Sequence, residues 1–307
     1  NNPWFQAETL FLNMQAFGEE GLSYLETMVS VAGMESPDGT AISAEETVEI
    51  LRERLNAADA RATGVTTRFQ IAILRFHPAA EDMLRFVYKF VHENDDLFVG
   101  VNMVGREDND KGYPLRFLDT LRELRREYSG VRLSIHAGEV DEPNYHVRDT
   151  LLLGADRIGH GNNLITDAET MRLMRHGPYL IEINLISNLL LNYINDYPEH
   201  PFPEYLRIGI PVTLSTDDRG MWDSTMTDEF FVAVREFDLS WKEVKSLSRN
   251  SLAYAFVQDE EKARLLRDFD ERIERFEASM QKYGLERLGE MPATRSFVCK
   301  RYELCED

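Results

Sequence analysis

Histidine and acidic side chains directly follow three apolar, strand-like segments of the 307-residue sequence. His136 ends the first segment, and Glu139 follows it by three residues. His160 ends the second segment, and the adjacent pair Asp217 and Asp218 follows the third. In a parallel α/β barrel the carboxyl ends of all strands meet at one face, where such enzymes place their active sites. We therefore expect these side chains to share one site.

The residue types at these positions suit metal-assisted hydrolysis. A neutral imidazole and a carboxylate are suitable zinc ligands, and a catalytic zinc keeps one position open for water. Zinc lowers the pKa of that water towards ~7, which makes hydroxide available at neutral pH. A second histidine and a second aspartate can orient and deprotonate the water, and a glutamate three residues after the ligand histidine can donate a proton.

Each of these residues also has a simpler interpretation when taken alone. A histidine at a strand end is commonly structural, and an aspartate pair before a helix commonly caps that helix. The functional interpretation depends on several such residues coinciding at one rim. We interpret the remaining histidines, which have no carboxylate partner in the sequence pattern, as structural or solvated: His77, His92, His146, His176 and His200.

Short apolar segments rich in Val, Ile, Leu and Phe alternate with amphipathic helical segments along the chain. This alternation predicts right-handed βαβ units and a parallel sheet. A glycine-rich phosphate-binding turn, expected in a nucleotide-binding open sheet, is missing after the first strand. The seven predicted strands are 24–30, 69–76, 97–104, 131–136, 156–160, 179–184 and 210–215.

Serine or threonine followed three residues later by glutamate predicts where helices begin. Three such pairs occur, at Ser43 with Glu46, Thr166 with Glu169 and Ser240 with Glu243. Further helices are predicted at 1–20, 115–128 and 259–284. No linker or repeat divides the chain, so we expect one barrel domain over 1–307, with a helical tail over 259–307.

Three segments resemble the motifs of the adenosine deaminase family in order and spacing. They are 134–139 (SIHAGE), 157–161 (RIGHG) and 214–218 (LSTDD). The segment 103–108 (MVGRED) resembles the family's purine-contacting segment and is most similar to the adenosine-deaminase growth-factor branch. The resemblance covers about residues 20–285.

This resemblance implies a TIM-like (β/α)8 barrel that holds one zinc ion. His136 and Asp217 would be zinc ligands, and Glu139 would protonate the purine N1, which requires a protonated carboxyl when substrate is bound. His160 and Asp218 would position the attacking water and take its proton, with Asp218 also facing the purine. Attack at C6 would release ammonia and give inosine.

The purine would also contact the backbone of Gly105 at N3, by the same resemblance. Two positions depart from the family pattern. Segment 182–188 (EINLISN) keeps Ser-Asn but lacks the Cys-Pro common in the family, which predicts an altered loop. Arg219 stands where many members have proline after the aspartate pair, which would change the surroundings of the ribose.

The first barrel strand of the family is not found in this sequence. Closure needs eight strands and we count seven. The family's other two zinc ligands form a His-x-His pair at the end of that strand, yet no such pair occurs and the first histidine is His77. Residues 1–20 are instead predicted to form the helix after it. We expect the strand to be missing from this chain, with a divergent, metal-free barrel as the alternative.

Composition limits the partners of the protein. The chain has 54 acidic and 34 basic residues, for a formal charge of −20, which repels nucleic acid and anionic membranes. No run approaches the ~20 apolar residues that span a bilayer. Both cysteines, Cys299 and Cys305, lie in the last nine residues, and two free thiols are favoured over one small disulfide loop.

The function predicted is deamination of adenosine or 2′-deoxyadenosine, with zinc as cofactor and a small nucleoside as partner. The alternatives are a deaminase of another 6-aminopurine, such as adenine or a modified adenosine, and a non-catalytic nucleoside-binding or growth-factor-like module. We find no basic cluster near the motifs to bind the phosphate of AMP. The growth-factor resemblance favours a secreted or periplasmic location over a cytoplasmic one, and a homodimer is compatible with it.

Overall fold

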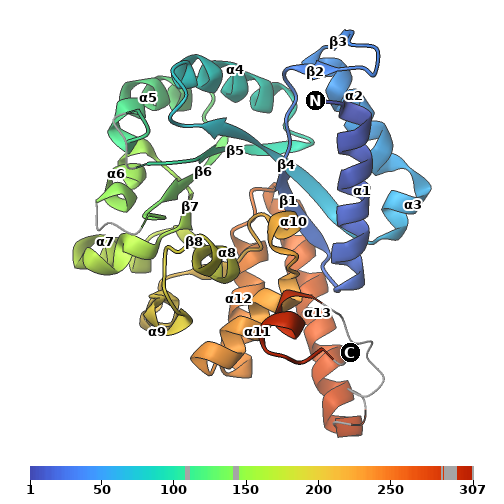
Figure 1. Ribbon diagram of the computed structural model, residues 1–307, viewed down its shortest axis with the longest axis vertical. Helices are drawn as coiled ribbons and strands as arrows, with labels where there is room; N and C mark the ends of the chain where they lie inside the picture. Colours follow the sequence, from blue (N-terminus) through green and yellow to red (C-terminus); the bar gives the residue numbers. More distant parts are fainter. Residues whose placement is uncertain (108–110, 141–144, 285, 287–295, 306–307) are drawn as a thin grey trace. The chain divides into compact units, whose positions relative to one another are not determined.

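The computed structural model describes residues 1–107, 111–140, 145–284, 286 and 296–305 (Figure 1). The chain divides into two compact units. The first unit comprises residues 1–182 and 207–211, and the second comprises 183–206 and 212–307. A single barrel domain over the whole chain stays a prediction, and each unit is described separately below.

A parallel sheet forms the centre of the first unit. In hydrogen-bonded order its six strands are β1 (Tyr24–Met28), β4 (Thr66–Leu74), β5 (Phe98–Val104), β6 (Arg132–Ala137), β7 (Arg157–His160) and β8 (Leu180–Ile183). The order is linear, so among the described residues β1 pairs on one side only. The seventh strand, β9 (Val212–Leu214), belongs to the second unit. Each predicted strand overlaps one of these seven, which confirms the expected seven-stranded, open version of a TIM-like sheet.

Helices connect the strands of the first unit, and Figure 1 shows α4 to α7 along the outer side of β4 to β7. The predicted N-terminal helix is confirmed as α1, and a short antiparallel hairpin of β2 and β3 was not predicted. The elements are α1 (Pro3–Glu19), β2 (Met34–Glu35), β3 (Ala41–Ile42), α2 (Ala44–Asn56), α3 (Ala58–Ala62), α4 (Ala80–Glu93), η1 (Pro114–Phe117), α5 (Leu118–Glu127), α6 (His146–Leu153), η2 (Asn162–Thr166) and α7 (Ala168–His176).

The second unit is mainly helical, and its strand β9 packs against α11 and α12. Its long charged helix α13 confirms the helix predicted in the tail. Its helices are α8 (Leu185–Leu190), η3 (Tyr197–Glu199), most of α9 (Phe202–Ile208), α10 (Arg219–Trp222), α11 (Met226–Phe237), α12 (Trp241–Ala253), α13 (Asp259–Tyr283) and α14 (Phe297–Arg301). In the described part of the chain, every helix is too short or too polar to cross a membrane.

Two details of the sequence interpretation need correction. The predicted start of α7 at Thr166 is wrong, because the Asp167 carboxylate caps this helix by accepting the N–H of Thr170 at 3.1 Å. The preference for free thiols is also wrong, since Cys299 and Cys305 form a disulfide beside α14. The other two predicted caps are confirmed at Ser43 and Ser240.

A network of buried polar side chains shows that the sheet of the first unit is strongly curved. Arg157 on β7 forms ion pairs with Glu26 on β1 and, at 2.9 Å, with Glu182 on β8. Three strands lie between β1 and β7 in the sheet order, so a flat sheet would place them ~19 Å apart. Direct contact between their side chains requires the sheet to curl until both face the same interior, as in a barrel.

Neighbouring residues complete the hydrogen bonding of these acids. Gln70 on β4 donates to Glu26 at 2.8 Å, and Ser134 on β6 donates to Glu182 at 2.9 Å. Burial lowers the pKa of Arg157, but the charges of Glu26 and Glu182 more than offset this and raise it above its usual range. The arginine therefore stays charged and joins strands from both ends of the first unit's sheet.

Replacing Arg157 by alanine should lower the free energy of unfolding by ~3–5 kcal/mol, because it removes the cation that pairs with two buried carboxylates. Arg132→Ala is the matched control, since Arg132 is exposed and pairs with Asp156 at 3.0 Å. It should cost less than ~1 kcal/mol. Urea unfolding followed by circular dichroism measures both, and equal losses would contradict the structural role given to Arg157.

Candidate active site

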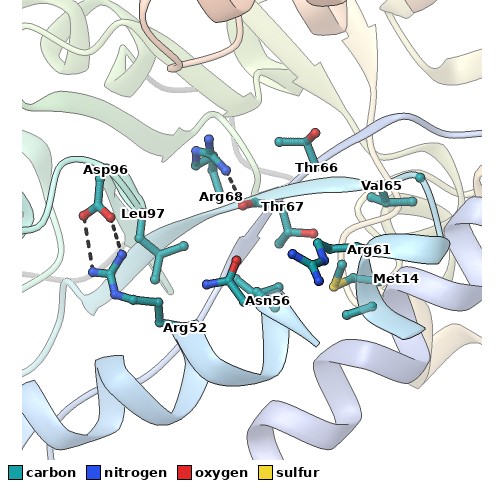
Figure 2. Close-up of a pocket in the computed structure, with 13 residues that line it drawn as sticks. Met14, Arg52, Asn56, Arg61, Val65, Thr66, Thr67, Arg68, Asp96 and Leu97 are labelled. Carbon is teal, nitrogen blue, oxygen red and sulfur yellow. Dashed lines mark hydrogen bonds and ion pairs between the residues drawn. The ribbon is translucent and has the colours of Figure 1, made fainter. Parts of the chain in front are cut away.

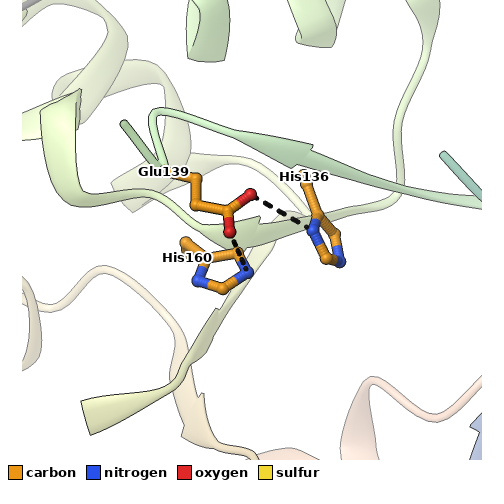
Figure 3. A group of neighbouring side chains, drawn as sticks. All are labelled: His136, Glu139 and His160. Atoms are coloured by element: carbon orange, nitrogen blue, oxygen red, sulfur yellow. Dashed lines mark ion pairs between the residues drawn. The ribbon is translucent and has the colours of Figure 1, made fainter. Parts of the chain in front are cut away.

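Three of the predicted site residues lie together at the carboxyl ends of adjacent strands (Figure 3). His136 is in β6, Glu139 follows that strand, and His160 is the last residue of β7. The Glu139 carboxylate lies 3.5 Å from Nδ1 of His136 and 3.6 Å from Nε2 of His160. One ligand atom from each residue lies within 4.8 Å of the others, so the group can hold a metal ion.

The backbone around this cluster explains why the sequence has glycine beside the histidines. The register of β6 and β7 places His136 opposite Gly159, and a Cβ on Gly159 would lie 2.7 Å from Cδ2 of His136. Any side chain there would displace the His136 ring. His160 has a φ of 66°, a left-handed conformation that non-glycine residues rarely adopt and that concentrates at functional sites.

The surroundings of Glu139 favour its ionised form. Burial raises the pKa of the Glu139 carboxyl. The hydrogen bond to His136 and the charges of His160 and Arg75 lower this pKa by a larger amount. The net result is a pKa of about 2. A role as proton donor therefore requires the pKa of Glu139 to rise when the purine is bound.

Glu107 supports Glu139 from behind, a role that the sequence analysis did not predict. Its carboxylate is buried, accepts the backbone N–H of Glu139 at 2.7 Å and lies 3.2 Å from Nδ1 of His146. His146 thus has a carboxylate neighbour that the sequence pattern did not show, and its interpretation as a structural residue stays a prediction. The position of Glu107 in the polar segment after β5 was the available signal, but the sequence does not show which backbone group it contacts.

Arg75 fixes the other side of the cluster and was also not predicted. Its side chain is fully buried after β4, donates to the carbonyl of Gly112 at 2.6 Å and donates to the carbonyl of His136. Burial lowers the pKa of Arg75 to about 10, opposed in part by the charges of Glu107 and Glu139. At neutral pH it remains a cation beside the two carboxylates.

Gly105 lies at the end of β5, where its φ of 86° requires a left-handed backbone. The side chains of Phe76 and Leu74 pack against it, and a Cβ on Gly105 would lie 2.7 Å from the Phe76 ring. Phe76 and Leu74 are themselves partly exposed. The glycine therefore presents its backbone beside an accessible apolar surface, as a flat aromatic ligand requires.

The two aspartates follow β9 in the second unit. Asp217 has a left-handed φ of 49°, and its N–H lies 3.5 Å from the Ser215 hydroxyl. Asp218 precedes α10, but its side chain forms no capping hydrogen bond, so the simple capping interpretation does not apply to it. The aspartate pair thus needs another explanation.

A buried carboxyl near Asp217 was missed by the sequence analysis. Glu229 on α11 is fully buried and accepts the N–H groups of Leu185 and Ile186 at the start of α8. Burial raises the pKa of Glu229 well above its usual value, and the charge of Asp217 adds to this despite the two N–H donors. Glu229 holds the start of the altered loop in which Cys-Pro is replaced.

Comparison with known proteins identifies the family. A model of the adenosine deaminase family matches residues 8–272. The chain belongs to the adenosine deaminase family. A metal-dependent aminohydrolase of this type deaminates a 6-aminopurine, which agrees with the reaction class predicted from the motif residues. Membership in the growth-factor branch stays a prediction.

Relatives with different substrates have similar sequences. The chain is 27% identical over 256 residues to an N6-methyl-AMP deaminase from Xenopus laevis, covering 82% of this chain and 71% of that protein. It is 31% identical over 194 residues to an adenosine deaminase from Enterococcus faecalis, covering 62% of this chain and 56% of that protein. The choice among 6-aminopurines is thus not decided by these relatives.

The fold is that of known amidohydrolases. A zinc-bound amidohydrolase from Burkholderia ambifaria superimposes with a TM-score of 0.74 at 19% identity, over 90% of this chain and 76% of that protein. The donor set in our structure suits such an ion, because imidazole nitrogens and a carboxylate are the ligands that zinc uses in catalytic sites. The residues present therefore fit a metal centre.

Removing the support behind Glu139 should slow deamination. We expect Glu107→Ala to lower kcat by roughly 10–100-fold, the range for lost supporting contacts at such sites, because Glu139 loses the acceptor of its backbone N–H. Glu107→Gln should retain more activity, since its amide oxygen can still accept that N–H. Glu123→Gln, in an exposed ion pair with Arg85, is the control. Steady-state rates equal to wild type in Glu107→Ala would contradict this role.

Proposed function

We propose that this protein catalyses the zinc-dependent hydrolytic deamination of adenosine or 2′-deoxyadenosine to inosine or 2′-deoxyinosine and ammonia. The observation that carries the proposal is the cluster of His136, Glu139 and His160 at the ends of two adjacent strands, inside the segments that match the family motifs. Glu139 lies between two imidazoles, and Glu107 accepts its backbone N–H. A protein that only binds a nucleoside would not need this arrangement.

The metal centre that we propose uses His136 and Asp217 as ligands from this chain. Two protein ligands fall short of the three that catalytic zinc sites normally have, so further donors are required. When bound, zinc supplies a water of lowered pKa as the nucleophile.

The remaining roles are assigned to side chains that can hold or move a proton. Glu139 faces both imidazoles and is proposed to donate to N1 of the purine as C6 is attacked. His160 and Asp218 are proposed to orient the attacking water and accept its proton, with Asp218 also facing the purine. The backbone of Gly105, next to the accessible Phe76, is proposed to contact N3.

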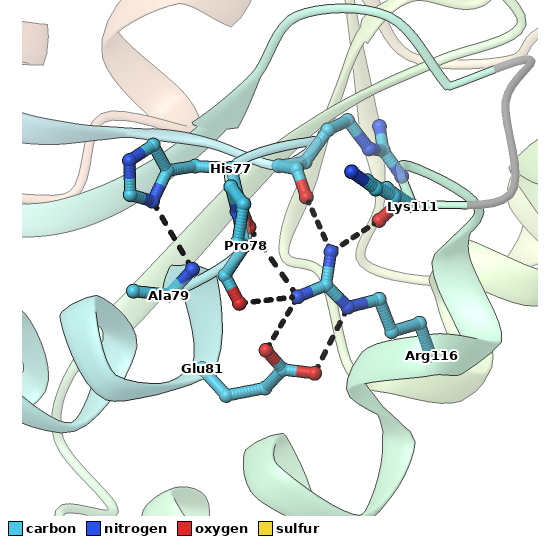
Figure 4. Close-up of polar contacts among 7 residues, drawn as sticks. His77, Pro78, Ala79, Glu81, Lys111 and Arg116 are labelled. Atoms are coloured by element: carbon cyan, nitrogen blue, oxygen red, sulfur yellow. Dashed lines mark hydrogen bonds and ion pairs between the residues drawn. The ribbon is translucent and has the colours of Figure 1, made fainter.

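Two arginines near the cluster are committed to groups of the protein. Arg116 donates to both carboxylate oxygens of Glu81 and to the carbonyls of His77 and Pro78 (Figure 4). Arg116 also donates to the carbonyls of Arg75 and Lys111. Its guanidinium N–H groups are therefore bound to the loops after β4 and β5. Arg75 is likewise committed to backbone carbonyls. Neither cation is available to bind a 5′-phosphate.

Glu139→Gln should keep the fold but slow adenosine turnover by at least ~100-fold, the scale of a lost general acid. The amide has nearly the same shape and cannot donate the required proton. The fall in absorbance as adenosine becomes inosine measures the rate, and the thermal melting curve checks the fold. Turnover near the wild-type rate would overturn the role assigned to Glu139.

The adjacent aspartates should have separable roles. We expect Asp217→Ala to remove bound zinc, because it deletes a proposed ligand, whereas Asp218→Ala should retain much of the zinc but lose activity. Metal analysis of the purified variants, alongside Asp223→Ala as a nearby exposed control, makes the comparison. Equal zinc loss in the first two variants would contradict the division of roles.

Direct competition among substrates tests the choice of purine. The Xenopus relative favours a modified nucleotide as the second candidate, so adenosine, 2′-deoxyadenosine, adenine and N6-methyl-AMP should be compared by kcat/KM. We expect the two nucleosides to be preferred. A higher kcat/KM for N6-methyl-AMP would replace the nucleoside proposal, and no turnover of any of them with zinc present would favour a binding module.

A further inference from the structure

The disulfide between Cys299 and Cys305 closes a small loop within the second unit. The two cysteines are six positions apart, and their Cα atoms lie 5.0 Å apart. The loop holds the end of α14 and the turn after it, where the carbonyl of Cys299 accepts the N–H groups of Leu304 at 2.8 Å and Cys305 at 3.2 Å. A helix of five residues is too short to be stable alone, so α14 depends on this cross-link and on its contacts with α11.

The start of α14 is anchored on α11 by the buried carboxylate of Asp228 (Figure 1). The Ser296 hydroxyl donates to this carboxylate at 2.6 Å, and the N–H of Val298 donates to it at 3.3 Å. Both donors precede Cys299 in the chain and therefore lie outside the disulfide loop. This anchor does not require the disulfide to be closed.

Tyr302 lies inside the loop and contacts α11 farther along. Its hydroxyl donates to the Glu236 carboxylate at 2.6 Å. Its ring centroid lies 5.5 Å from that of Phe231, and the guanidinium carbon of Arg235 lies 4.6 Å from the same ring. These side chains are half-buried or exposed, so each contact contributes little by itself. The loop therefore depends on its closure to keep Tyr302 in place.

Lys300 connects the same loop to the segment that carries the aspartate pair. It pairs with Asp223, the residue that directly follows α10, and both side chains are exposed. The helix α10 has four residues and begins directly after Asp218. The carbonyl of Asp218 accepts the N–H groups of Met221 and Trp222. The backbone at Asp218 is thus linked to the disulfide loop through this short helix.

One end of the disulfide is open to a thiol reagent. Cys299 is buried, but Cys305 is half-buried and follows Leu304, which is 55% exposed. Attack of a thiolate on one sulfur is enough to begin exchange, and exposed disulfides are the labile ones. A dithiol supplies two electrons and two protons, becomes a disulfide itself, and leaves Cys299 and Cys305 as two thiols.

We propose that this disulfide is a redox-sensitive latch that keeps the C-terminal loop docked on α11 and α10. When it is closed, the loop has few conformations other than the docked one. When a dithiol opens it, the contacts of Tyr302 and Lys300 no longer offset the conformational entropy of the freed residues, and both contacts are lost. Ser296 stays bound to Asp228, so the two thiols remain near each other and the disulfide can form again.

Hydrogen–deuterium exchange of the whole protein, with and without dithiothreitol, tests the latch. Thiol titration checks that the disulfide is open, and circular dichroism checks that the fold remains. We expect amide exchange in peptides covering α14 and α10 to become about tenfold faster or more, because the cross-link no longer limits local opening. Peptides covering α1 and α2 of the first unit should not change. These readouts are independent of the proposed deamination.

Two variants separate the cross-link from the ion pair. Cys299→Ser combined with Cys305→Ser should give the fast exchange of both helices without reductant and should not respond to dithiothreitol. Lys300→Gln should speed exchange in α10 while α14, still closed by the disulfide, stays slow. Arg52→Gln is the matched control, because it removes the cation of a surface ion pair with Asp96 in the first unit (Figure 2). It should leave exchange in α10 and α14 as in wild type.

Faster exchange of both helices after reduction, reversed on reoxidation, supports the latch. A disulfide that dithiothreitol cannot open in the folded protein would overturn it. Unchanged exchange in α14 and α10 after reduction would also overturn it, since the loop would then stay docked without the cross-link. A change confined to α14, or an effect of Arg52→Gln as large as that of Lys300→Gln, would contradict the link through Lys300 to α10.

Discussion

The contact between Arg157 and Glu26 requires the sheet of the first unit to curl. Side chains from β7 and β1 can meet only if the three strands between them bend around a common interior. The same curvature turns the carboxyl ends of β4 to β7 toward one another, which brings Arg75, Glu139 and His160 within electrostatic reach. The buried ion pairs thus fix the shape on which the candidate active site depends.

The candidate active site is held mainly by backbone contacts. Arg75 and Glu107 each bind a main-chain group of the segment that carries His136 and Glu139, and thereby position those side chains indirectly. Arg116 fixes the adjacent loops in the same way. This arrangement fixes the backbone that carries the reactive side chains. Arg75 and Arg116 donate to groups of the protein, although both lie near a site proposed for an uncharged nucleoside.

Strands and motif residues could be predicted from the sequence because both follow local rules. Apolar runs such as 97–104 can be buried on both faces only in a covered parallel sheet, and His136 and His160 occupy strand ends by simple counting. The supporting residues could not be found this way. Glu107 acts through a backbone N–H 32 positions away. Asp167, and not Thr166, caps α7, because its carboxylate accepts the N–H of Thr170. Such choices depend on tertiary geometry.

The partners of the ion pair that curls the sheet are 131 residues apart in the chain. A contact of such long sequence separation forms late, because the closure entropy of the intervening loop must be overcome first. While the chain is being synthesised, β1 can already pair with β4, but the Arg157 partner of Glu26 is made only later. The ion pair between Glu26 and Arg157 therefore forms only after five strands of the sheet exist, and folding of this unit is coupled to the completion of β7.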